Sequence, residues 1–124
     1  MTKHNQLSTN FNSKEFDSPD LMFSGNYISL KLIKILELIR VEIKQPITIN
    51  SGYRTIKHNK FVGGTKNSSH LRGFAADIRI TTDKQRFLFL AAAVKFGINR
   101  IGIRKDFIHI DIDSNKNSFR TWLY

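Results

Sequence analysis

The sequence predicts an α+β fold: a small, mainly antiparallel sheet with two or three helices packed on one side of it. Two long segments have helical hydrophobic spacing, and about four short segments have strand-like composition. These segments do not alternate in the regular strand–helix–strand order that a parallel sheet requires. With 124 residues, the chain is expected to form a single domain with its own core, and its polar first ten residues are expected to be flexible.

The helices are predicted from hydrophobic spacing and from signals at their ends. Between residues 28 and 43, apolar side chains recur every three or four positions and charged side chains occupy the opposite side. Residues 81–97 have a good N-cap in Thr82 and a closing glycine in Gly97. A further helix start is indicated at residues 17–21, where a serine precedes a proline.

Four short segments are predicted to be strands: residues 47–50, 75–80, 100–104 and 107–112. The last two are close together, and we expect a hairpin that turns at Lys105 and Asp106. Residues 56–66 are expected to form a long polar loop, a kind of segment that often carries function. At the end of the chain, Trp122 and Tyr124 are predicted to cover the edge of the core rather than to contact a ligand.

Composition excludes several classes of protein. The chain has no cysteine, which excludes disulfides and thiolate chemistry and leaves His, Asp and Glu as the strong metal ligands. No apolar run approaches the ~18 residues needed to cross a bilayer. The N-terminus lacks the apolar stretch of a secretory signal. We therefore expect synthesis in the cytoplasm without a signal peptide, and release or export if the target lies outside.

The chain is strongly basic, with a formal net charge of +10. Its lysines and arginines are scattered along the sequence, and no tract has the density of a nucleic-acid-binding arm. The charge therefore favours attraction to an anionic surface, such as an acidic cell-wall polymer, over nucleic-acid recognition. We expect a monomer.

A candidate metal site lies in the stretch SSHLRGFAAD, residues 68–77, which contains His70 and Asp77. Alternation along the strands places Asp77 and His109 on the face that is not apolar. Two histidines and one aspartate form a three-ligand zinc set with an open fourth position, as in catalytic zinc sites. Taken singly, each side chain could instead be structural or solvated. Asp111 could orient His109 or serve only in strand pairing.

Three blocks of sequence carry a resemblance to a known family. SSHLRGFAAD matches the signature S-x-H-x-x-G-x-A-x-D, SGYRT at residues 51–55 resembles the segment before it, and DFIHIDI at residues 106–112 resembles a closing motif. These blocks resemble the M15 zinc peptidases, which include D-alanyl-D-alanine carboxypeptidases and phage endolysins and share the hedgehog/DD-peptidase fold.

The resemblance implies roles for six residues. His70, Asp77 and His109 would bind one Zn²⁺ per chain, and Asp106 would act as the catalytic acid/base. Arg54 would bind substrate and stabilise developing negative charge, and Ser68 would hydrogen-bond substrate or loop backbone. His4 and His58 match no such position.

The activity implied by the resemblance is hydrolysis of peptide bonds in the stem peptides of bacterial peptidoglycan, by attack of a metal-activated water. The resemblance leaves open which bond is cut. A carboxypeptidase of this family would remove a terminal D-alanine, whereas an endolysin would cut the L-alanyl-D-glutamate bond. The alternative is a non-catalytic wall-binding or virion module that keeps the zinc-peptidase fold.

Overall fold

A five-stranded sheet forms the centre of the chain, as seen in a computed structural model that describes residues 2–124. The strands lie in the order β1-β2-β4-β3-β5. Their bounds are Ile49–Ser51 (β1), Ala75–Arg79 (β2), Arg100–Ile103 (β3), Phe107–Asp111 (β4) and Arg120–Leu123 (β5). All neighbours pair antiparallel except β3 and β5, which are parallel. The predicted α+β class is confirmed.

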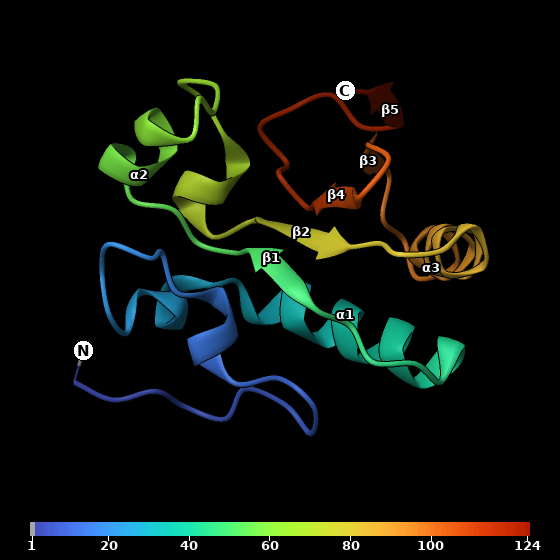
Figure 1. Cartoon of the computed structure of the whole chain (residues 1–124), viewed down its shortest axis with the longest axis horizontal. Helices are drawn as coiled ribbons and strands as arrows, with labels where there is room; N and C mark the ends of the chain where they lie inside the picture. The colour runs from blue at the N-terminus through green and yellow to red at the C-terminus, as the bar shows by residue number, and fades with distance from the viewer. Residues whose placement is uncertain (1) are drawn as a thin grey trace.

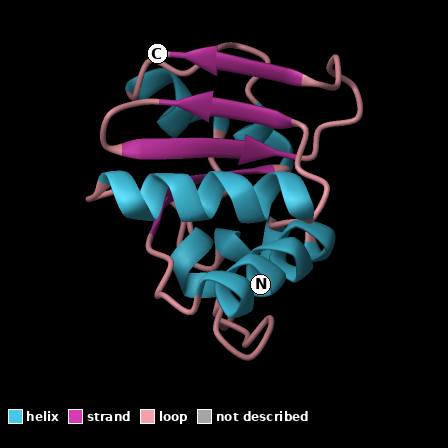
Figure 2. Cartoon of the chain, turned by 90° about the vertical axis from the view of Figure 1, so that its right-hand side faces the viewer, coloured by secondary structure: helices cyan, strands magenta, loops and turns pink. Residues whose placement is uncertain are grey.

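Three α-helices and three short 3₁₀ helices accompany the sheet within residues 2–124. The α-helices are Leu30–Ile43 (α1), Ile56–Phe61 (α2) and Asp83–Lys95 (α3), and the 3₁₀ helices are Ser13–Phe16 (η1), Ser24–Tyr27 (η2) and Ser69–Arg72 (η3). In Figure 1, α1 runs beneath β1 and β2, and α3 is seen end-on beside the sheet. Figure 2 shows α3 lengthwise on the side that faces the viewer, with most of the strands visible above it.

One face of the sheet packs against α1 and α3 and forms the core. Leu36 from α1, Phe89 from α3 and Ile78, Ile108 and Ile110 from the sheet are all buried in one cluster. The isoleucines alternate along β2 and β4 with residues of the opposite face. The sheet therefore has one apolar face for folding and one face left for polar side chains.

The structure corrects two of the predicted segments, a helix start at residues 17–21 and a loop at residues 56–66. The helix start at residues 17–21 is wrong, because this segment is a turn. The Ser18 hydroxyl donates to Asp20 and accepts the Thr55 N–H, so it does not cap a helix. The predicted loop at residues 56–66 contains α2, which Thr55 caps by accepting the N–H of His58 at 3.0 Å.

The end of the chain is a strand, not only a cover for the core edge. Residues of β5 pair with β3 from Arg100↔Arg120 to Ile103↔Leu123, which adds a fifth strand at the edge of the sheet. The β-branched and aromatic residues Thr121 and Trp122 favour this conformation, but parallel pairing with a non-adjacent strand has no local sequence signal.

The N-terminal segment lies along η1 and α1. Asn5 N–H donates to Ser13 Oγ at 2.8 Å, and Asn10 donates to Glu37 through both its backbone and its side chain. The predicted flexibility of residues 1–10 stays a prediction, and Met1 lies outside the described residues. Within residues 2–124, no helix is both long and apolar enough to cross a membrane.

Candidate metal centre

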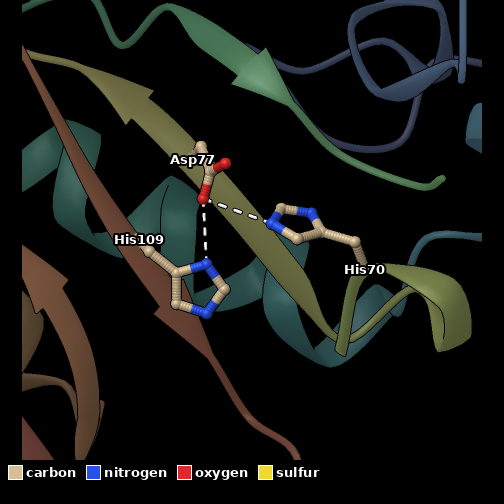
Figure 3. A group of neighbouring side chains, drawn as sticks. All are labelled: His70, Asp77 and His109. Atoms are coloured by element: carbon tan, nitrogen blue, oxygen red, sulfur yellow. Dashed lines mark hydrogen bonds and ion pairs between the residues drawn. The ribbon is translucent and has the colours of Figure 1, made fainter. Parts of the chain in front are cut away.

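Three buried side chains converge on the polar face of the sheet: His70, Asp77 and His109. Asp77 on β2 lies directly opposite His109 on β4, and both are on the polar face that strand alternation predicted for them. His70 reaches the same point from η3, which precedes β2 (Figure 3). One ligand atom from each residue lies within 4.8 Å of the other two, so the three can bind a single ion.

The turn that carries His70 depends on the residues that flank it. Ser68 caps the N-terminus of η3, and its hydroxyl accepts the N–H of His70 at 3.3 Å. Gly73 ends η3 in the left-handed conformation, with φ of 72°. A Cβ on Gly73 would lie 2.2 Å from the carbonyl oxygen of Tyr27, so both conformation and space require glycine here.

In each histidine, one ring nitrogen contacts an oxygen atom outside the metal-ligating group, and the other ring nitrogen points toward Asp77. His70 Nδ1 contacts the Gly52 carbonyl oxygen at 2.7 Å, and its Nε2 lies 3.2 Å from Asp77 Oδ1. His109 Nε2 contacts Asp111 at 2.8 Å, and its Nδ1 lies 2.9 Å from the same Asp77 oxygen. Such outer partners orient histidine ligands in metal sites.

The donor set fits zinc. Ligand atoms about 2.0–2.2 Å from a tetrahedral zinc ion are ~3.3–3.6 Å apart, only slightly more than the two contacts with Asp77. Two imidazoles and one carboxylate leave a fourth position for water or substrate. Little rearrangement is needed to place an ion between these three side chains.

The electrostatics of the three side chains follow from their partners. Burial alone would raise the pKa of Asp77, but its contacts with His109 and His70 hold that pKa well below its usual range. Burial lowers the pKa of His70, although Asp77 opposes the effect. Burial also disfavours charge on His109, but Asp111 and Asp77 together raise its pKa, because this ring contacts two carboxylates. Asp77 is therefore an anion, ready to bind a cation.

Arg54 lies beside the three ligands, on the segment that follows β1. Its Nη2 donates to Asp77 Oδ2 at 3.2 Å, its Nη1 to Asn59 Oδ1 at 3.2 Å and its Nε to Ser51 Oγ at 3.0 Å. A Cβ on Gly64 would lie 2.0 Å from Asn59 Oδ1. The glycine after α2 thus gives Asn59 the room to hold the guanidinium.

A cavity of ≈ 690 Å³ opens onto the metal-ligating group. Ser68, the residues of the group and Arg54 line it, together with cationic side chains of Arg100, Arg104 and Lys116. Ser68 is buried and its oxygen accepts the His70 N–H, so its first role is to support the turn.

Trp122 and Tyr124 also line this cavity, so they do more than cover the core edge. The Trp122 ring lies 5.5 Å from the His109 ring, centroid to centroid. Gly102 on β3 makes this possible, because a Cβ there would lie 2.5 Å from Trp122 Nε1. The sequence alone gave no signal for this wall, because it depends on the pairing of β5 with β3.

Asp106 is not brought to the metal-ligating group. It lies at the turn between β3 and β4, where its side chain is 70% exposed and 3.5 Å from Arg104 Nε. The carboxylates that line the cavity are instead Asp77 and Asp111. The two remaining histidines, His4 and His58, lie outside the group, with His4 bound to Asp17.

Comparison with known proteins identifies the family. The sequence profile of Peptidase M15 matches residues 4–111, which include all three candidate ligands. The chain belongs to peptidase family M15. This M15 chain is also 43% identical over 51 residues to the zinc D-Ala-D-Ala carboxypeptidase of Streptomyces albus G.

That match covers 41% of this chain and 19% of the relative, so the chain spans about a fifth of the relative's length. The family predicted from the sequence is confirmed, and the comparisons support the predicted enzyme class, a zinc metallopeptidase. The individual roles of the M15 site residues stay predictions.

Proposed function

We propose that this M15 chain is a zinc-dependent peptidase that hydrolyses peptide bonds in the stem peptides of bacterial peptidoglycan. The observation that carries the proposal is the convergence of His70, Asp77 and His109 at a cavity large enough for a peptide. The catalytic metal sites of zinc hydrolases have three protein ligands and an open position, as this group does.

Bound zinc supplies a Lewis acid that polarises a carbonyl oxygen and lowers the pKa of water to near neutrality. We expect Arg54 to stabilise the negative charge that develops on the carbonyl oxygen, because its guanidinium lies against Asp77 and is fixed by Asn59 and Ser51. Burial lowers the pKa of Arg54, while Asp77 opposes that shift, so a partly dehydrated cation faces the substrate.

The charge of the cavity supports an anionic peptide substrate. Four cationic side chains line it, from Arg54, Arg100, Arg104 and Lys116, against the carboxylates of Asp77 and Asp111. Stem peptides carry carboxylates close to either bond that M15 peptidases cut. The relative from Streptomyces albus G is named for the terminal D-alanyl-D-alanine bond. We propose both this bond and the L-alanyl-D-glutamate bond as candidates.

Asp106 remains our candidate for the acid/base, on the resemblance of DFIH to the closing motif. A general base must come within about 2.6–3.2 Å of the proton that it takes, but such contacts often form only when substrate binds. For Asp106 to act, the β3–β4 turn has to bring its carboxylate from solvent over the cavity. Its ion pair with Arg104, itself a cavity residue, would have to move with it.

The net charge of +10 supports a further part of the proposal, attraction to anionic wall polymers. We propose that the enzyme acts at the bacterial wall after release or export, as phage lytic enzymes do. Lysis that falls steeply with added salt would support this attraction.

Digestion of purified peptidoglycan, with and without a chelator, tests the function. We expect stem-peptide fragments, identified by mass spectrometry, that disappear with chelator and return with added zinc. Release of D-alanine from the stem peptide would identify a carboxypeptidase. Fragments with a new N-terminal D-glutamate would identify an endopeptidase. A zinc-bound chain that binds the wall but releases no fragment would refute the proposal and favour a non-catalytic module.

A further inference from the structure

Asp111 is a buried carboxylate that lies against a metal ligand and has no part in the steps proposed above. It follows His109 by two positions on β4 and is 1% exposed. Its Oδ2 lies 2.8 Å from His109 Nε2. An ionised carboxylate can only accept a hydrogen bond, so the proton between these atoms belongs to the imidazole nitrogen.

The second oxygen of Asp111 is fixed by two donors. Arg100 Nε donates to Oδ1 at 2.7 Å, and the backbone N–H of Asp113 donates to the same oxygen at 3.2 Å. Arg100 is itself held, because its Nη1 donates to the Asn117 carbonyl and its guanidinium stacks 5.2 Å from the Trp122 ring. Asp111 therefore cannot turn away from His109 without breaking its contact with a half-buried arginine.

We propose that Asp111, locked by Arg100, is a positioning residue that keeps a hydrogen of His109 on Nε2, so that Nδ1 is the nitrogen left to bind the ion. A histidine can bind a metal through either nitrogen, and the hydrogen bond to one nitrogen decides which is left. Only Nδ1 of His109 points toward Asp77 and His70. The proposal rests on the proposed metal site but not on the identity of the substrate.

The contacts of Asp111 predict an effect of Asp111→Asn that simple loss of a contact would not give. Arg100 and the Asp113 N–H both require an acceptor at the Oδ1 position, so the amide oxygen takes that place. The amide NH₂ then faces His109 Nε2 and donates to it. The hydrogen of the neutral His109 ring is then favoured on Nδ1, which is the nitrogen that the metal needs. An Asp-to-Asn change beside a catalytic histidine is known to act in this way: it leaves the geometry intact and enforces the wrong tautomer.

Zinc affinity, measured by competition with a chromophoric chelator, is the first test. We expect Asp111→Asn to weaken zinc binding roughly 10–100-fold, the usual effect of losing an outer partner of a ligand. Asp113→Asn is a matched control, since Asp113 is as buried, pairs with Arg72 and contacts none of the three ligands. It removes the same charge and should leave zinc affinity unchanged.

The ring protonation of His109 is the second test and needs no substitution. Long-range ¹H–¹⁵N spectra of the zinc-loaded chain should show hydrogen on Nε2 of His109 and metal on Nδ1. Unchanged zinc affinity in Asp111→Asn, equal loss in both variants, or hydrogen on Nδ1 of His109 in the zinc-loaded unmodified chain would each overturn the proposal. Both readouts are independent of peptide hydrolysis, so they can fail while the peptidase function stands.

Discussion

Zinc should stabilise the folded chain by an amount that the site and the chain length predict. The three ligands are already assembled in the fold, whereas an unfolded chain without cysteine offers no thiolate and only scattered ligands. At a free zinc concentration 100 times the Kd, preferential binding to the folded state contributes about 2.7 kcal/mol. An unfolding entropy of about 2.1 cal/mol/K per residue over 124 residues then converts this to a rise in Tm of about 10 °C.

Differential scanning calorimetry of the chelator-treated chain, with and without added zinc, measures this rise. His70→Ala should abolish it, because two ligands hold zinc far less tightly than three. His58→Ala is the matched control and should keep the full rise, since His58 lies on α2, outside the metal-ligating group. Each variant is compared with its own zinc-free sample, which removes the effect of the substitution on stability. An equal rise in His70→Ala and the unmodified chain would refute the site.

Two further substitutions test other parts of the structure. Asp106→Asn should abolish hydrolysis while zinc content stays near one per chain; full activity with bound zinc would remove Asp106 from the mechanism. Glu37→Gln should lower the free energy of unfolding at neutral pH by about 1 kcal/mol, because a charged acceptor of the Ser8 and Asn10 hydrogen bonds is lost. Burial alone would raise the pKa of Glu37, but these contacts lower it, so their contribution is present above the ordinary carboxyl pKa and disappears as pH falls through the folded value. Urea unfolding at a series of pH values should show the variant and the unmodified chain converging in acid.

The sequence predicted the centre of the sheet and its chemistry because both follow from local rules. Alternation along β2 and β4 separates Ile78 and Ile108 from Asp77 and His109, and burial of both isoleucines on one face selects a register that brings Asp77 and His109 together on the other. The caps of α3 were equally local, with Thr82 accepting the Gln85 N–H. Such features need no knowledge of distant contacts.

The errors arise where a distant contact outcompetes a local signal. Ser18 has the sequence context of a helix cap, but the backbone of Thr55 takes its hydroxyl. Trp122 looked like a cover for the core edge, and its place in the cavity depends on parallel pairing of β5 with β3. The position of Asp106 depends on the course of a turn, which the spacing of the D-x-x-H motif does not specify.

Trp122 and Tyr124, the aromatic residues of the cavity lining, have a consequence for how the selectivity of such an enzyme can change. Trp122 on the edge strand β5 and Tyr124 directly after it border the cavity, and both lie beyond residues 4–111, the part that matches the family profile. None of the three metal-ligating residues lies on that strand. A substitution of Tyr124 keeps the contact between Arg100 and Trp122 and can therefore alter the shape of the cavity without moving the three metal-ligating residues, so that selectivity and reactivity can evolve separately.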